Sequence, residues 1–392
     1  MIRSLKAELA SLLGESITTA KERERKAFDE LIGKDKIEGY LLFGSGGLGR
    51  RTLTGLRKLG IEPHGFVDNN ASIWNTTVDA LNVFSPQDAV RKFPNHVFIL
   101  TIWSDAIGHP FEEVQAQLNE LNKVKVVSFI FLYWKYPEVF LPYFEIDLPH
   151  KTLKQAYIIK SAFLLWDDDA SCAEFMAQVR LRLYGDSKGL PPPTIGKQYF
   201  PVDLFKINPD EVFIDCGAFD GDTFREFLLK SHEEFSRYIA YEPDPDNCRK
   251  FKEYLSLLSN SIAGKVSVFQ VAVSNQKKTI SFEAIGSLQS VIKDDGNISV
   301  NCISLDEDLT SVMPTYIKMD AEGAEPEIIL GATQLILKHF PILAISVYHQ
   351  FDHLWKLPLM VNAINPDYKF YLRPHCKAGW DLVCYSVPRY RQ

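Results

Sequence analysis

Residues 211–223 read EVFIDCGAFDGDT, an apolar run that ends in an aspartate and passes into a glycine turn. The run predicts a buried strand, and TFREFLLKS (223–231) predicts the helix that follows it. Gly217 and Gly221 let a ligand approach the backbone closely. A strand, a glycine turn and a helix in this order are typical of the first unit of a nucleotide-binding α/β sheet.

The chain beyond this unit alternates between predicted strands and helices. Alternation of this kind predicts a doubly wound α/β sheet, and the closing hairpin predicts that its last strand is antiparallel. The predicted strands are RYIAYEPD (237–244), VSVFQVAVS (266–274), TISFEA (279–284), VNCISLDEDL (300–309), TYIKMDAEG (315–323), PILAISVYH (341–349), YKFYLRP (368–374) and DLVCYSVP (381–388).

A second glycine turn, GSGGLG (44–49), follows the predicted strand YLLFG and precedes the predicted helix TLTGLRKLG. Its spacing is that of the dinucleotide fingerprint, and Asp68 at the end of the next strand completes the pattern. This unit predicts a smaller Rossmann-like domain with a second nucleotide or sugar site. The candidate residues there are Gly44, Gly46, Gly49, Arg50, Asp68 and Asn69.

The chain divides into four predicted parts. Residues 1–38 form a helical lead-in, and 39–135 form the Rossmann-like nucleotide-binding domain. Residues 136–196 form a helical bridge or cap that ends at the stiff segment LPPPTIG (190–196), and 197–392 form the larger α/β domain.

The composition of the 392 residues limits the class of partner. A net charge of -7 argues against broad binding to nucleic acid or to an anionic membrane surface. The sequence contains neither a secretory leader nor an apolar run of membrane-spanning length, and its six cysteines lack CxxC spacing. We therefore expect a cytoplasmic protein with reduced thiols that acts on a small-molecule or glycan acceptor.

The charge of the turn at 215–223 indicates its ligand. Asp215, Asp220 and Asp222 would repel a pyrophosphate, whereas they favour a cation. Glu242 ends the next strand, where a carboxylate can hold both hydroxyls of a ribose. A nucleoside without phosphate but with positive charge fits these residues, which predicts S-adenosylmethionine as the cofactor.

The motifs DCGAFDGDT, YEPDPDN (241–247), IKMDAEGAEPEIILGA (317–332) and VYHQFDHLW (347–355) resemble those of FkbM-type methyltransferases. The resemblance covers residues 200–350 and implies a class I methyltransferase fold. It also implies O-methylation of a sugar or natural-product hydroxyl, as in polysaccharide biosynthesis. The cofactor-binding residues that it suggests are Asp215, Gly217, Ala218, Gly221, Asp222, Thr223, Glu242, Pro243, Asp244, Ala272 and Tyr199.

Some of these residues have a structural alternative. Asp222 and Thr223 suit the cap of the following helix, and Tyr199 suits either a cover over the cofactor or a place in the core.

A sugar hydroxyl must lose its proton as it accepts a methyl group, so a base is expected in the cleft. Asp320 and Glu322 follow a strand and are candidates for the base, or for ligands of Mg²⁺ that would lower the pKa of the hydroxyl. His349 is the other candidate base, with Lys318 to orient it or the acceptor. The alternative for Glu322 and Glu325 is that they only favour the N-terminus of the next helix.

The segments GSGGLGRR (44–51) and HGFVDNN (64–70) resemble the N-terminal domain of bacterial sugar acyltransferases that bind nucleotide-linked amino sugars. The resemblance implies that Arg50 or the amides of the turn meet phosphate, and that Asp68 or Asn69 meets a ribose or sugar. The alternative is a domain that serves only packing or the formation of a homodimer.

These observations predict an S-adenosylmethionine-dependent O-methyltransferase whose acceptor is a sugar, a nucleotide-linked sugar or another glycan precursor. A different class of function places the activity in the first domain, as an NAD-dependent oxidoreductase or a sugar-nucleotide-binding protein, with the second domain a non-catalytic module that binds S-adenosylmethionine. The absence of a Tyr-x-x-x-Lys pair near the first turn argues against the oxidoreductase.

Overall fold

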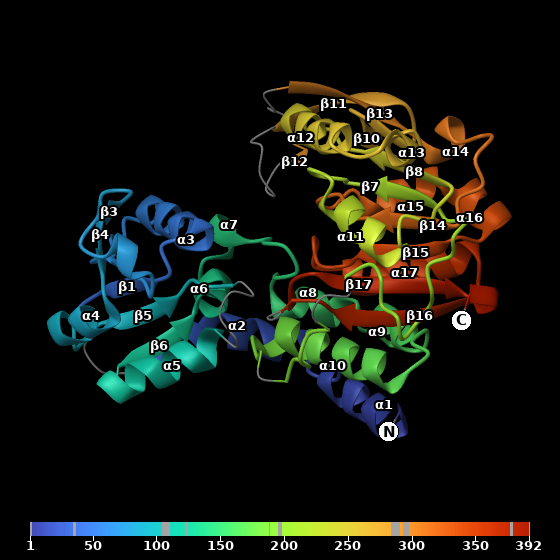
Figure 1. Cartoon of the computed structure of the whole chain (residues 1–392). Coiled ribbons are helices and arrows are strands. Elements are labelled where there is room, and N and C mark those ends of the chain that lie inside the picture. Colours follow the sequence, from blue (N-terminus) through green and yellow to red (C-terminus); the bar gives the residue numbers. More distant parts are fainter. Residues whose placement is uncertain are drawn as a thin grey trace. The chain divides into compact units, whose positions relative to one another are not determined.

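The computed structural model describes residues 2–33, 37–103, 110–122, 124–187, 189–194, 198–283, 291–292, 298–376 and 379–391. The predicted domain boundary at residues 196 and 197 lies outside the described residues. The chain forms two compact units, drawn in Figure 1. The first unit contains Met1–Tyr157, Ala173–Pro192 and Cys376–Trp380, and the second contains Ile158–Cys172, Pro193–His375 and Asp381–Gln392.

The first unit is built on a six-stranded sheet in the order β3-β4-β2-β1-β5-β6. Its strands pair in parallel except for the β3–β4 hairpin. The strands are β1 (Tyr40–Phe43), β2 (Phe66–Val67), β3 (Thr77–Val78), β4 (Leu81–Phe84), β5 (Val97–Leu100) and β6 (Lys125–Ser128). The helices are α1 (Ile2–Leu12), α2 (Ile17–Ile32), α3 (Gly47–Lys58), η1 (Ala71–Ile73), α4 (Pro86–Lys92), α5 (Pro110–Leu121), α6 (Phe129–Lys135), α7 (Pro137–Phe140) and α8 (Pro149–Lys154).

The second unit is built on a seven-stranded sheet in the order β16-β17-β15-β14-β7-β8-β9. The strands from β15 to β9 are parallel, whereas β17 is antiparallel to both β15 and β16. The sequence-based prediction of a doubly wound sheet with an antiparallel last strand is therefore confirmed. The strands are β7 (Val212–Cys216), β8 (Arg237–Tyr241), β9 (Val266–Phe269), β14 (Tyr316–Met319), β15 (Ile342–Ser346), β16 (Tyr368–Pro374) and β17 (Leu382–Pro388).

A small sheet in the order β10-β13-β11-β12 extends the second unit, and the sequence did not predict it as a separate sheet. Its strands are β10 (Ala272–Val273), β11 (Lys278–Glu283), β12 (Val291–Ile292) and β13 (Ile298–Ile303). Residue 284, the last of the predicted strand TISFEA, lies outside the described residues.

The remaining helices lie between residues 156 and 391, and two of them, α9 and α10, contribute residues to both units. Among the described helices, none combines the length and the apolar character that a membrane span needs. The helices are α9 (Ala156–Phe163), α10 (Asp169–Tyr184), α11 (Asp222–Lys230), α12 (Pro245–Ser256), α13 (Asn260–Ala263), α14 (Leu305–Asp308), α15 (Glu325–Gly331), α16 (Thr333–His339), α17 (His353–Ile364) and η3 (Arg389–Arg391).

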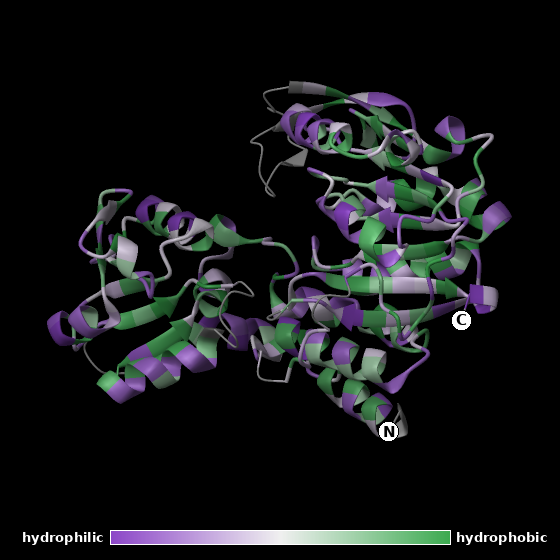
Figure 2. Ribbon diagram, in the orientation of Figure 1, coloured by the Kyte–Doolittle hydropathy of each residue, from purple (hydrophilic) through white to green (hydrophobic). Residues whose placement is uncertain are grey.

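Three stacked aromatic rings pack together on β7 and its two neighbouring strands in the second unit. The ring of Phe213 stacks on Tyr238 of β8 at 4.9 Å and on Tyr316 of β14 at 4.5 Å, measured between ring centroids. All three side chains are fully buried. Figure 2 shows the strands as mainly hydrophobic, whereas α5 and α12 carry hydrophilic stretches. This packing holds β7 between its two neighbours and fixes the point from which the glycine turn leaves the sheet.

We predict that Phe213→Ala lowers the free energy of unfolding by about 3–5 kcal/mol, because it leaves a cavity between two stacked rings. Chemical denaturation followed by circular dichroism measures the change. The matched control is Leu229→Ala, since Leu229 is 76% exposed on α11 and should change stability by no more than about 0.5 kcal/mol. Equal losses in the two variants would contradict the assignment of Phe213 to the core.

Candidate active site

Two of the three aspartates at the end of β7 and in the turn after it are paired with cations. Asp215 is fully buried, with Lys318 Nζ 3.0 Å from its Oδ1 and the Tyr238 hydroxyl donating to its Oδ2 at 2.5 Å. Asp220 forms an ion pair with Arg225 at 2.5 Å, and Asp222 stands exposed at the start of α11. The strongly acidic turn expected from the sequence is therefore largely neutralised, which weakens the argument from its charge alone.

Lys318 holds the turn together. Its Nζ also donates to the carbonyl oxygen of Gly217 at 2.5 Å, so one buried ammonium joins β14 to the first residue of the turn. Burial by itself would lower the pKa of Lys318, but the neighbouring charges of Asp215 and Asp320 hold it above its ordinary value. The lysine therefore stays charged, and its role in the structure is to pair with Asp215.

The two glycines of the turn are required by close approaches. Gly217 has φ +85°, and a Cβ there would lie 1.8 Å from the carbonyl oxygen of Asp320. Gly221 has φ +87°, and a Cβ there would lie 2.5 Å from the ring of Phe251. The turn after β7 and the turn after β14 therefore touch through their backbones, which brings the predicted cofactor and catalytic segments together.

Glu242 closes the turn from the end of β8. Its Oε2 accepts a hydrogen bond from Phe219 N at 2.9 Å, and its Oε1 accepts one from Asp244 N at 2.9 Å. Burial raises the pKa of Glu242 to about 7. Each oxygen keeps a further lone pair, so the carboxylate can still accept hydrogen bonds from a diol.

The other predicted cofactor residues lie in three places. Asp244 caps α12 by accepting from Asp246 N at 2.9 Å and Asn247 N at 3.2 Å. Ala218 and Thr223 are buried beside the turn and Pro243 follows Glu242, whereas Ala272 lies on β10, opposite Cys302 of β13. Whether these residues contact a cofactor stays a prediction.

Asp320 and His349, two of the predicted catalytic residues, meet at the ends of β14 and β15. The Nε2 atom of His349 lies 3.4 Å from Asp320 Oδ1 and 4.0 Å from Glu322 Oε2. The Tyr199 hydroxyl donates to Asp320 Oδ2 at 2.7 Å, and the Tyr199 ring lies 5.2 Å from Lys318 Nζ. Tyr199 is therefore a buried partner of the catalytic candidates.

The sequence missed the role of Glu325, the first residue of α15. Its Oε1 lies 2.8 Å from His349 Nδ1 and accepts from Ala321 N at 2.8 Å, and its Oε2 lies 3.3 Å from His353 Nδ1. Glu325, His349 and His353 are all buried. A carboxylate at a helix start gives no sign by itself that a histidine from the next strand will reach it.

The charges of this cluster set its protonation. Burial would lower the pKa of His349, but Glu325, Asp320 and Glu322 together raise it to about 10. Burial would raise the pKa of Glu325, yet His349 and His353 hold it below its ordinary value. Burial raises the pKa of Glu322 to about 7, against the lowering effect of His349. Near neutral pH the cluster therefore holds an imidazolium, an ionised Glu325 and a Glu322 close to its midpoint.

The same cluster offers metal-ligating atoms: those of Asp320, Glu325 and His349 lie within 4.8 Å of one another. Glu325 and His349 already pair with each other, and Asp320 pairs with Tyr199. These groups therefore form hydrogen bonds with one another in this structure. The predicted Mg²⁺ ligands were Asp320 and Glu322, and magnesium binding stays a prediction.

The polar candidate residues of the first unit interact with other residues of that unit. Asp68 Oδ2 accepts from Ser45 N at 3.0 Å and from its hydroxyl at 2.6 Å, while the amide of Asn69 pairs with Gln117. Arg50 is exposed and lies 3.9 Å from Asp79.

The three glycines of this turn differ in what surrounds them. A Cβ at Gly49 would lie 2.0 Å from Gly44 O, and a Cβ at Gly44 would lie 2.7 Å from Ile102, so both are needed for the tight crossing. Gly46 has open space beside it.

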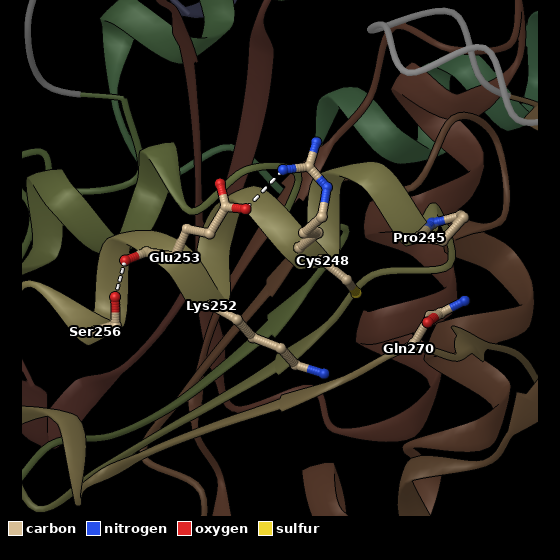
Figure 3. Close-up of a pocket in the computed structure, with 7 residues that line it drawn as sticks. Pro245, Cys248, Lys252, Glu253, Ser256 and Gln270 are labelled. Atoms are coloured by element: carbon tan, nitrogen blue, oxygen red, sulfur yellow. Dashed lines mark hydrogen bonds and ion pairs between the residues drawn. The ribbon is translucent and has the colours of Figure 1, made fainter.

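A surface pocket of about 400 Å³ lies against α12. In Figure 3, Cys248 and Lys252 of α12 lie on the side that faces Gln270, which follows β9. Its other lining residues are Pro245, Arg249, Glu253 and Ser256. None of the predicted catalytic residues lines this pocket, so it has no part in the chemistry proposed below.

Comparison with known proteins finds similarity to methyltransferases. Residues 215–370 match the family model of the methyltransferase FkbM domain. The chain is similar in structure to methyltransferase FkbM from Methylobacillus flagellatus KT, with 20% sequence identity, a TM-score of 0.73, and coverage of 96% of this chain and 99% of that chain. The second unit thus has the fold of class I methyltransferases, and the match of its central segment supports a methyltransferase.

Two further solved structures match parts of the chain. UDP-D-quinovosamine 4-dehydrogenase from Vibrio fischeri is 20% identical over 24% of this chain and 78% of its own, with a TM-score of 0.20. Precorrin-6y C5,15-methyltransferase from Geobacter metallireducens GS-15 is 15% identical over 50% of this chain and 90% of its own, with a TM-score of 0.32. The search of curated proteins found no match.

We predict that the free energy of unfolding falls by about 2 kcal/mol between about pH 7.5 and 9.5 because of His349. Its folded pKa is raised above its unfolded value, so its contribution is complete below about 6.5 and is lost as the pH rises to about 10. Urea denaturation at several pH values measures this fall, which His349→Gln should abolish. The control His339→Gln should keep it, because the pKa of His339 is lowered. Identical profiles for wild type and His349→Gln would contradict the assignment.

Proposed function

We propose that this protein is an S-adenosylmethionine-dependent O-methyltransferase. The observation that carries the proposal is the glycine turn between β7 and α11, closed by Glu242 and set beside an acid–histidine cluster, within a segment that matches a methyltransferase family model. The fold and the family support methyl transfer, and the cofactor is inferred from the residues at the sheet edge.

The turn and Glu242 would hold the cofactor. The turn at 217–221 would hold the amino acid end of the nucleoside, and Glu242 can accept hydrogen bonds from both ribose hydroxyls. When bound, S-adenosylmethionine supplies an electrophilic methyl group on a sulfonium. Because Asp215 and Asp220 are paired with Lys318 and Arg225, recognition of positive charge falls mainly to groups other than these two.

Glu322 is the base in this proposal. Its side chain is one-third exposed, and its pKa of about 7 suits proton transfer near neutral pH. His349 was the other candidate, but its raised pKa keeps it protonated there, so it serves better to hold Asp320 and Glu322 in place. Glu322 would accept the proton of the acceptor hydroxyl, which makes that oxygen a better nucleophile toward the methyl group that the bound cofactor would supply.

The acceptor in this proposal is a hydroxyl of a sugar, a glycan precursor or a natural product. This choice of acceptor rests on the resemblance of the motifs to those of FkbM-type methyltransferases. Tyr199 and Asp320 would position it beside Glu322, and no step in this mechanism requires Mg²⁺. A cytoplasmic location, a homodimer and a place in polysaccharide biosynthesis stay predictions from the sequence.

Calorimetric titration with S-adenosylmethionine tests the cofactor. We expect Glu242→Gln to weaken binding by about 10- to 100-fold, because it removes the charge that accepts the ribose hydroxyls. Asp246→Asn is the control, since Asp246 is exposed on the neighbouring helix and should bind as the wild type does. If the wild type bound NADH and gave no heat with S-adenosylmethionine, the activity would belong to the first unit instead.

Kinetics of transfer from radiolabelled S-adenosylmethionine to a panel of sugars and nucleotide-linked sugars test the base. We expect Glu322→Gln to lower kcat by about 100-fold or more while leaving cofactor affinity unchanged. The wild-type kcat/KM should rise with pH through about 7, the pKa of Glu322. A variant that retained wild-type kcat would exclude Glu322 as the base.

A further inference from the structure

The sheet of the first unit has a switch point between β1 and β5. From β1 the chain adds β2 and β4 on one side, and then returns to add β5 and β6 on the other. Ligands of open α/β sheets bind where the order reverses, beyond the carboxyl ends of the strands. The residues just after β1 and β5 therefore mark a place where the first unit can bind a ligand.

Two of the side chains that the sequence suggested for this place, Asp68 and Asn69, already form hydrogen bonds with neighbouring residues. Asp68 is held by Ser45, and Asn69 is held by Gln117. Recognition at the switch point must then come from other side chains.

Aromatic rings gather at the same edge. Trp103 follows β5, and its ring lies 5.5 Å from that of Trp380 and 6.0 Å from that of Tyr143. Phe144 lies 4.6 Å from Trp380 and 5.0 Å from Tyr143. All four residues are half-buried and belong to the first unit. We call them the aromatic cluster.

A cation is fixed beside this cluster. The guanidinium of Arg51, on α3, lies 4.8 Å from the centre of the Tyr143 ring and donates to Phe140 O at 3.2 Å. Arg51 is exposed, and it forms no ion pair with a carboxylate within the described part of the chain. Its remaining N–H donors can therefore serve an anionic ligand.

From these observations we propose that the aromatic cluster and Arg51 bind an anionic carbohydrate. The apolar C–H face of a sugar ring packs against aromatic faces, and a guanidinium fork pairs with a phosphate or a carboxylate. A site with several aromatic rings and one cation fits a ligand that has one apolar face and one acid group. The proposal rests on the proposed function for the idea that the acceptor is a sugar, and it assigns sugar binding to the first unit.

Calorimetric titration of the full chain without cofactor tests this site. The probes are a set of UDP-, GDP- and dTDP-linked hexoses, UDP alone, a uronic acid disaccharide and a neutral disaccharide. We expect at least one anionic saccharide to bind and the neutral one to bind at least about tenfold more weakly. Binding by a nucleotide-linked hexose or by the uronic acid would distinguish phosphate from carboxylate as the acid group.

Variants locate the site. Arg51→Gln should weaken binding at least about tenfold, whereas Arg57→Gln, exposed on the same helix and paired with Glu62, should leave it unchanged. Trp103→Leu should weaken binding and Trp103→Phe should restore most of it. Unchanged thermal unfolding midpoints show that the variants fold.

Three results would overturn the proposal: no binding of any anionic saccharide, UDP alone binding as tightly as its sugar conjugates, or equal effects of Arg51→Gln and Arg57→Gln. Sugar binding without S-adenosylmethionine binding would keep this proposal and reject the proposed function. The reverse result would keep the proposed function and reject this site.

Discussion

The buried ion pair of Asp215 and Lys318 is the constraint on which the second unit depends. The two residues lie opposite each other in the register of β7 and β14, and both side chains are almost completely inaccessible to water. Removing one partner from such a pair leaves an uncompensated buried charge, which costs about 3–5 kcal/mol. Because Lys318 also holds the carbonyl of Gly217, the same charge fixes the origin of the glycine turn.

The ion pair also links the two halves of the candidate active site. The turn after β7 crosses the turn after β14 at Gly217 and Asp320, so a shift of one strand would displace both the cofactor edge and the acidic cluster. Around Asp320, hydrogen bonds from Tyr199 and contacts of His349 with Glu325 make a network of fixed charges. Such a preorganised arrangement stabilises developing charge without rearrangement during the reaction.

The two units contribute different chemistry. The second unit offers carboxylates with raised pKa values at the ends of parallel strands, whereas the first offers aromatic rings and Arg51 at the switch point of its own sheet. In the glycine turn of the first unit, Gly49 packs closely against the backbone of Gly44, and the Ser45 hydroxyl donates a hydrogen bond to Asp68. A dinucleotide-type spacing therefore does not by itself reveal which side chains remain available to a ligand.

The sequence by itself determined the seven strands of the larger sheet, its antiparallel end and the position of the glycine turn at 217–221, because apolar periodicity and glycine are local signals. It also placed Asp320 and His349 at strand ends that prove to be neighbours. Only the tertiary structure decided that Lys318 neutralises Asp215, that Glu325 reaches His349 and that the small β10–β13–β11–β12 sheet stands apart. Those outcomes depend on strand register and on contacts between residues that are distant in sequence. Local residue spacing predicts neither of them.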